Sequence, residues 1–216
     1  MNTFKLSTML CALILLIQSG AAMAIEEPSF EVIEKNSPFE IRQYRKQIIA
    51  ETFAEGELSS ASNRGFRLIA GFIFGDNRSI DATSDQKSEK IAMTAPVTVA
   101  PQSGSASADY QANRWRIQFT MPEKYSIATL PKPVNPAVTL REIPAKRYAI
   151  IVFSGFTGTE KIRQKTTDLL NWMHTKELIA IAPPQLARYD PPWILPFFRR
   201  NEILIEIAAP QYQRFS

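Results

Sequence analysis

Alternation of apolar and polar residues recurs along this chain, and it constrains the fold more than any other feature. Residues 91–99, 114–121 and 202–207 alternate clearly, and residues 39–44 do so over a shorter length. Such alternation is typical of strands that are buried on one face. Residues 48–53 and 148–153 are more continuously apolar, which indicates inner strands. The chain is therefore predicted to form an antiparallel sheet.

Two segments instead have the 3.6-residue period of amphipathic helices. In residues 58–74, one face carries Ala61, Gly65, Leu68, Ile69 and Phe72. Residues 158–178 carry a second stripe, made by Ile162, Thr166, Leu169, Leu170 and Met173. Thr157 and Glu160 have the spacing of a capping box at the start of this second helix. The polar stretches 76–89 and 102–113 are predicted to be exposed loops.

The order of these elements repeats within the chain. Residues 41–56 can be laid over residues 140–155 at an offset of 99, which places Arg42 on Arg141 and Gly56 on Gly155. Each block reads strand, strand, glycine, helix. Residues 113–122 and 201–210 both run from Asn through an alternating strand to Pro. We expect two similar α+β halves whose strands form one pseudo-symmetric sheet, with a groove for a small apolar ligand between helices and sheet.

The first 24 residues have the features of a secretory signal peptide. Lys5 precedes an apolar run over residues 6–17, and Ala22-Met23-Ala24 matches a cleavage site. An uncleaved anchor is the alternative, but the run is short for a membrane span. The prediction is a signal peptide at 1–24 and a single domain at 25–216, exported to the periplasm or secreted. Cys11, the only cysteine, leaves with the signal, so the mature domain would have no disulfide or thiol nucleophile.

Composition and motifs argue against several classes of function. The net charge of +4 is spread along the chain, and no dense run of Lys or Arg indicates nucleic-acid binding. His174 is the single histidine, no G-x-S-x-G turn is present, and no two histidines have zinc-ligand spacing. No segment after the leader is apolar enough to cross a membrane. We therefore predict a protein that is not an enzyme.

Three segments together resemble a known family. Lys90-Ile91-Ala92-Met93-Thr94-Ala95-Pro96-Val97 is followed far along the chain by Tyr189-Asp190-Pro191-Pro192 and then Arg199-Arg200-Asn201-Glu202. With the flanking residues 40–44, these segments resemble the SOUL haem-binding protein family. The resemblance implies an α+β fold: a distorted antiparallel β-barrel of about eight strands, with two helices packed on it. It also implies binding of haem or a related tetrapyrrole in a shallow apolar cleft.

The resemblance implies particular cofactor-binding residues on the first helix. Arg64 matches a basic position near the haem propionates, and Leu68, Ile69 and Phe72 would form the cleft floor beside Gly65 and Gly71. The alternatives are ordinary core packing for the apolar residues and a solvated surface position for Arg64.

Iron ligation is expected to be weak or absent. Gln43, predicted to face the cleft, stands where some relatives carry a proposed axial histidine, and glutamine is a poor haem ligand. We expect no metal-binding residue, with His174 on the flank of the second helix as a weak candidate. The cofactor would be neither tightly nor covalently held.

The apolar loop Trp193–Phe198, stiffened by prolines and followed by two arginines, has three interpretations. It covers the cleft as a lid, contacts a membrane, or packs into the core. We expect packing at the cleft edge, with Trp193 contacting the cofactor.

The leading hypothesis is an exported, non-enzymatic binding protein for haem or another porphyrin. A second is a small-molecule sensor or hydrolase using the same groove, with a carboxylate such as Glu51 or Glu142. A third is an envelope interaction protein that docks on a membrane or partner through Trp193–Phe198.

Overall fold

The computed structural model describes residues 25–80, 88–102 and 112–209. The predicted signal peptide lies outside these residues. In chain order the elements are β1 (Phe30–Asn36), β2 (Phe39–Tyr44), β3 (Gln47–Glu55), α2 (Leu58–Phe74), β4 (Asn77–Arg78), β5 (Val97–Pro101), β6 (Arg114–Thr120), β7 (Lys132–Pro133), β8 (Thr139–Ile143), β9 (Lys146–Phe153), α3 (Thr159–Thr175), β10 (Gln185–Arg188), the 3₁₀ turn η2 (Pro196–Phe198) and β11 (Asn201–Glu206). None of the described helices is both long and apolar enough to span a membrane.

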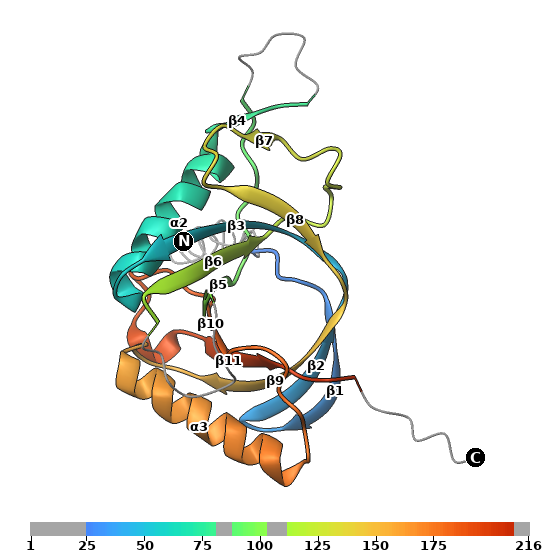
Figure 1. The fold of residues 1–216 in the computed structure, drawn as a ribbon, viewed down its shortest axis with the longest axis vertical. Coiled ribbons are helices and arrows are strands. Elements are labelled where there is room, and N and C mark those ends of the chain that lie inside the picture. The colour runs from blue at the N-terminus through green and yellow to red at the C-terminus, as the bar shows by residue number, and fades with distance from the viewer. Residues whose placement is uncertain (1–24, 81–87, 103–111, 210–216) are drawn as a thin grey trace, which may run out of the picture.

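Nine strands form one antiparallel sheet in the order β1-β2-β9-β11-β10-β5-β6-β3-β8. The sheet curls strongly into a half-barrel, and α2 and α3 pack on its outer side (Figure 1). The short strands β4 and β7 form a separate pair at one end of the molecule. The predicted α+β fold with two helices on a curled antiparallel sheet is confirmed, with β1 as a ninth strand in the sheet.

The two halves of the chain have the same order of elements. The series β2-β3-α2-β5-β6 corresponds to β8-β9-α3-β10-β11, and under this correspondence the sheet order from β2 to β8 reads the same from both ends. β2 pairs with β9 and β8 pairs with β3, so each half lends its first strand to the other. Gly56 and Gly155 follow the corresponding strands with positive φ of 97° and 105°, a conformation that favours glycine. An exact two-fold relation between the halves stays a prediction.

The main core lies between the helices and the sheet. From α2 it takes Ala61, Ile69, Phe72 and Ile73, and from α3 it takes Ile162, Leu169 and Met173. Gly65 lets α2 approach β6 closely, because a Cβ at this position would lie 2.6 Å from the Ile117 side chain. The predicted helix 58–74 has the bounds observed for α2, and α3 is slightly shorter than the predicted 158–178.

Two local predictions were wrong. The strand predicted over 91–99 begins only at Val97. Pro96 has no backbone N–H and cannot donate to a ladder, so regular pairing starts after it. The capping box is also absent: Gly158 is the N-cap of α3 with no side-chain cap, and Glu160 instead pairs with Arg163 at 2.7 Å.

The face of the sheet away from the helices buries polar residues. Arg42 donates to Glu40 at 2.6 Å and to both carboxylate oxygens of Glu202 at 3.0 and 3.1 Å. Phe30 of β1 lies over the Arg42 guanidinium, with 4.4 Å to the ring centroid. Because β1 covers this face, the polar residues of β2 that alternate with its apolar ones are buried as well.

Candidate ligand-binding cavity

A cavity of about 610 Å³ opens where α2 faces the end of the sheet. Its floor is one row of residues across three adjacent strands. Arg188 at the end of β10 pairs with Val97 of β5 on one side and with Asn201 of β11 on the other. Arg188 is two residues after Leu186 on β10, so both side chains lie on the same face of the strand. Because Leu186 belongs to the main core, this is the face covered by the helices.

The walls come from α2 and from two loops. Ser62 and Asn63 line the cavity one helical turn before Phe66, and Phe74 lines it at the far end of the helix. Twelve residues at 1.5 Å per residue make this wall about 18 Å long. The segment before β5 contributes Met93, and Trp193 lies at the rim after β10. The lining is mostly apolar and aromatic, which suits a flat hydrophobic ring.

Arg188 and Ser62 are two polar groups of this lining for which a missing protein partner matters, because both are at least partly desolvated. The guanidinium of Arg188 makes no hydrogen bond or ion pair with any described residue, and burial lowers its pKa. Ser62, which is 3 % exposed, has an Oγ without a hydrogen-bond partner. Ser62 Oγ is buried without a partner, which costs free energy, and the half-buried guanidinium of Arg188 is partly desolvated. Both groups would therefore gain from a ligand that brings hydrogen-bond acceptors.

The other charged residues of the lining already have partners. Arg199 donates to the carbonyl oxygens of Ile194 and Pro192, and Asp190 accepts from the backbone N–H of Arg200. Within the described lining, Arg188 is therefore the cation that remains available to a ligand.

Tyr189 anchors the loop at the mouth of the cavity. Its hydroxyl donates to Glu202 at 2.8 Å, and Arg200 lies 3.5 Å from its ring centroid. Burial and the negative charge of Glu202 raise the pKa of Tyr189 far above its usual range. A phenol held protonated in this way is a poor donor to ferric iron.

Met93 is the single described lining residue with a sulfur or imidazole donor. Its thioether could approach a haem iron, as methionine does in some haem proteins. No group of three or more His, Asp or Glu residues that could hold a metal ion occurs in the described part of the chain.

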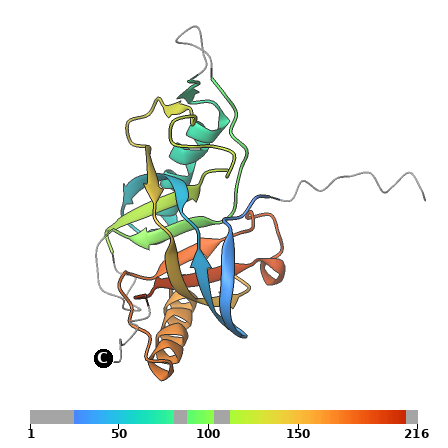
Figure 2. The same ribbon diagram turned by 90° about the vertical axis from the view of Figure 1, so that its right-hand side faces the viewer.

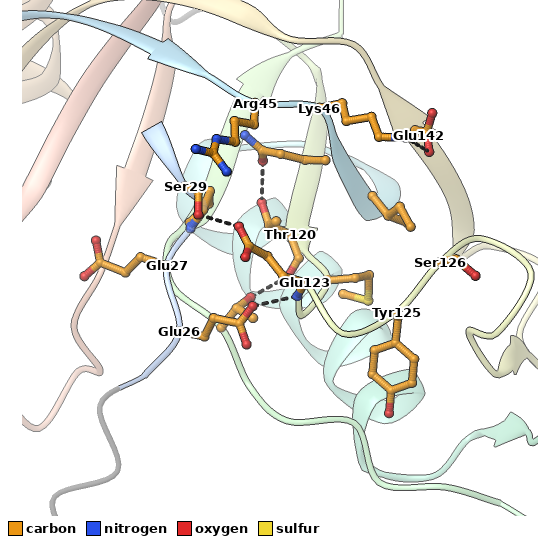
Figure 3. Close-up of a pocket in the computed structure, with 15 residues that line it drawn as sticks. Glu26, Glu27, Ser29, Arg45, Lys46, Thr120, Glu123, Tyr125, Ser126 and Glu142 are labelled. Carbon is orange, nitrogen blue, oxygen red and sulfur yellow. Dashed lines mark hydrogen bonds and ion pairs between the residues drawn. The ribbon is translucent and has the colours of Figure 1, made fainter. Parts of the chain in front are cut away.

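A second cavity, of about 330 Å³, lies where β3 begins and β6 ends, and most of its lining residues are polar (Figure 3). Most of its polar groups have partners within the protein: Ser29 donates to Glu123, Thr120 donates to Gln47 at 3.0 Å, and Lys46 lies 3.7 Å from Glu142. Arg45 is exposed rather than desolvated. The larger cavity, with its unpaired Arg188, is the better candidate for a ligand.

The residues predicted for the first helix do not line either cavity. Arg64 is exposed and donates to the carbonyl oxygen of Glu55. Ile69 and Phe72 lie in the core, and Leu68 packs against it. The face of α2 that borders the large cavity carries Ser62 and Phe66 instead. The proposed role of the predicted residues stays a prediction, without support from either cavity.

The structure also locates the other residues predicted for the cofactor site. Gln43 of β2 accepts from Arg147 at 3.4 Å and donates to the Tyr44 carbonyl at 3.4 Å, outside both cavities. His174 is exposed at the end of α3. Trp193 lines the large cavity, and it is largely exposed rather than packed into the core.

Sequence reasoning missed Arg188, Ser62, Phe66 and Met93. A signal existed for Met93, because both sequence motifs line this cavity: residues 93–97 lie on one side and residues 189–193, 199 and 201 lie on the other. No pattern in the sequence pointed to Arg188, because many arginines at strand ends are simply exposed to solvent.

Comparison with known proteins gives a family and a fold. Residues 25–206 match the family model described as SOUL heme-binding protein. Among solved structures, the EcmrR C-terminal domain has a TM-score of 0.57 at 11 % identity, with 80 % of this chain and 98 % of that chain covered. A hydrolase encoded by lin2189 from Listeria innocua has a TM-score of 0.51 at 12 % identity, with 79 % and 91 % covered. These likenesses show the fold alone. The search of curated proteins gave no significant match.

Proposed function

The chain belongs to the SOUL heme-binding protein family, and we propose that it binds haem or a related porphyrin in the large cavity. The observation that carries this proposal is the unpaired guanidinium of Arg188 in an otherwise apolar lining. A porphyrin offers a flat apolar ring together with carboxylates. These are the two properties that the walls and the floor of this cavity would complement.

In the proposed complex the ring lies along the α2 wall against Phe66, with Trp193 closing over its edge. A propionate accepts hydrogen bonds from Arg188, which can bind a carboxylate through two parallel N–H groups. The Ser62 hydroxyl supplies a further donor. The proposal thus moves the propionate partner from Arg64 on the helix to Arg188 on the sheet.

The iron contributes little to the proposed affinity. Met93 is the one thioether at the wall, and the Tyr189 hydroxyl is held by Glu202. We expect binding to be driven by burial of the ring and by the charge of Arg188. When bound, haem would supply redox or ligand-binding chemistry, while the residues of this chain bind and orient the ring.

As to its role, the proposal is an exported carrier or store in the periplasm or outside the cell, without enzymatic activity. The leader sequence at residues 1–24 supports export. The rival sensor or hydrolase function finds less support. Although burial opposes ionisation of Glu51, hydrogen bonds from Arg141 and Gln118 outweigh it, and the pKa of Glu51 lies below its usual range. Glu51 lines neither cavity, whereas Glu142 lines the smaller one, where Lys46 lies 3.7 Å away.

A haemin titration followed in the Soret band tests the proposal. The protein should bind one haemin saturably, and Arg188→Ala should weaken binding by about tenfold or more, because a charge-assisted hydrogen bond contributes roughly 1.5–3 kcal/mol. Arg64→Ala is the matched control and should leave the affinity unchanged. Equal loss in both variants, or loss in Arg64→Ala alone, would contradict the assignment of Arg188. Absence of saturable binding would overturn the proposed function.

Iron-free protoporphyrin separates ring burial from ligation. It should bind about as tightly as haemin, and Met93→Leu should leave the affinity for both porphyrins unchanged. A strong preference for haemin that Met93→Leu removes would show that this thioether is an axial ligand.

A further inference from the structure

The loop between β10 and β11 exposes an unusual amount of apolar surface. The exposed fractions are 80 % for Trp193, 56 % for Leu195, 63 % for Phe197 and 71 % for Phe198, and the neighbouring Phe156 is 69 % exposed. Arg199 joins the loop to Phe156, because its guanidinium lies 5.6 Å from that ring centroid. We call these five apolar residues the aromatic tip. Contiguous apolar patches are rare on monomeric proteins and indicate a contact surface.

The aromatic tip is held outward by the backbone. Pro196 begins the 3₁₀ turn η2, and its carbonyl oxygen accepts from Gly155 N–H at 2.9 Å. Arg199 Nε donates to the Ile194 carbonyl at 2.7 Å, which closes the loop on itself. Figure 2 shows this orange-red loop projecting from the body of the molecule, close to where the described chain begins at residue 25. The apolar side chains are thus presented to the surroundings on a stiff support.

The uncompensated charge beside the aromatic tip is positive and belongs to Arg199. Residues 191–200 contain Arg199 and Arg200 and no Asp or Glu. Arg199 donates only to carbonyl oxygens, so no described carboxylate neutralises its charge. Arg200, by contrast, forms an ion pair with Glu27 and lies 3.8 Å from Glu202. Apolar aromatic side chains beside the uncompensated Arg199 match the boundary between the acyl chains and anionic headgroups of a bilayer. A tryptophan at the end of such a tip suits this boundary, since its ring is apolar and its N–H is polar.

We propose that the aromatic tip docks the protein on the surface of an anionic lipid bilayer, with Trp193, Phe197 and Phe198 inserted at the headgroup level. The contact is peripheral. It rests on the exposure and charge of the tip and does not depend on what the cavity binds. Since Trp193 belongs both to the tip and to the cavity rim, docking would bring the cavity mouth to the lipid surface.

Tryptophan fluorescence reports this contact directly. Of the three tryptophans, Trp115 and Trp172 are buried, so quenching by acrylamide acts mainly on Trp193. Vesicles of phosphatidylcholine with phosphatidylglycerol should protect Trp193 from acrylamide and shift its emission to the blue. Lipids brominated near the headgroup should quench it. Vesicles of phosphatidylcholine alone should require about fivefold more lipid, because Arg199 then has no anionic partner. The leader contains no tryptophan, so the signal comes from the domain, and the variants compared below carry the same leader.

The variant Phe197→Ser/Phe198→Ser keeps the Trp193 reporter and should require at least about tenfold more lipid. Its matched control is Ile179→Ser/Ile181→Ser, which removes two side chains that are 64 % and 57 % exposed elsewhere on the surface. This control should bind like the parent. Unchanged quenching at every lipid concentration would overturn the proposal, as would equal weakening in both variants. Protection of Trp193 without lipid, in step with dimer formation, would assign the tip to a second copy of the chain instead.

Discussion

Arg64 and Arg188 carry the same charge in different surroundings. Arg64 is exposed on α2 and donates to the Glu55 carbonyl. Arg188 lies among apolar side chains at the cavity floor, and no described residue pairs with it. An unpaired charge in apolar surroundings costs free energy in the ligand-free protein, and a bound anion would recover part of that cost. The sequence shows that both arginines are present, but it does not show that their surroundings differ.

Replacing Arg188 by methionine tests this reasoning at a single residue. Arg188→Met should raise the free energy of unfolding of the ligand-free protein by about 1 kcal/mol, because a side chain of similar length without a charge fits the apolar wall. The same variant should bind haemin at least about tenfold more weakly. Urea denaturation and the Soret titration measure the two effects on one protein. If Arg188→Met instead destabilises the protein, the guanidinium has a structural partner, and the account of an unsatisfied charge is wrong.

Among the elements, α2 was predicted with its exact bounds because its apolar positions recur at helical spacing over the whole segment. The strand predicted over 91–99 was too long, since alternation alone does not register the missing donor of Pro96. Gly65 was expected to let a flat ring approach the helix, but it faces Ile117 of β6. Periodicity thus identified the buried face of α2, while the partner of that face was set by the sheet.

Substitution of the two helix glycines tests the close contact between α2 and β6. Gly65→Ala should lower the free energy of unfolding by about 1–3 kcal/mol, because the new methyl group would clash with Ile117. At Gly71 an added Cβ meets only the end of the Asp76 side chain, which can rotate away. Gly71→Ala should therefore be neutral or stabilise by up to about 1 kcal/mol through helix propensity. Guanidinium denaturation of the two variants measures their free energies of unfolding. An unchanged free energy of unfolding in Gly65→Ala would show that α2 and β6 can move apart without cost.

At the scale of the whole molecule, the alternating segments, the two helices and their repeated order were enough to predict one antiparallel α+β sheet with both helices packed on it. The curling of this sheet into a distorted barrel was implied by the family resemblance. The cavity was not predictable in the same way. Most of its lining comes from residues 62–74, 93–97 and 188–201, and the strand order β11-β10-β5 brings the last two segments together. The position of Arg188 between Val97 and Asn201 follows from strand register, and no local pattern reports that register.

The polar face of the sheet gives the molecule a pH dependence of its own. Burial, with the carboxylate of Glu202 as a further cause, raises the pKa of Tyr44 and Tyr189, and burial beside Glu206 raises that of Tyr148. A tyrosine whose pKa is higher in the folded protein stabilises the fold fully below its pKa in the unfolded chain, ~10. That contribution is lost as the pH rises through the folded value. Alkali should therefore act on the fold through these three phenols.

An alkaline titration checks this expectation. Tyrosinate absorbance near 295 nm should stay low for Tyr44, Tyr148 and Tyr189 beyond pH 10 and then rise in one step, together with the loss of the circular dichroism of the sheet. Tyr125, whose pKa burial and Glu89 raise to about 12, ionises without unfolding and serves as an internal comparison. Using Tyr110→Phe/Tyr212→Phe as the parent removes the two tyrosines outside the described residues. If three phenols titrate gradually near pH 10 while the circular dichroism is unchanged, the polar face is open to water and the network of Arg42 and Glu202 does not close it.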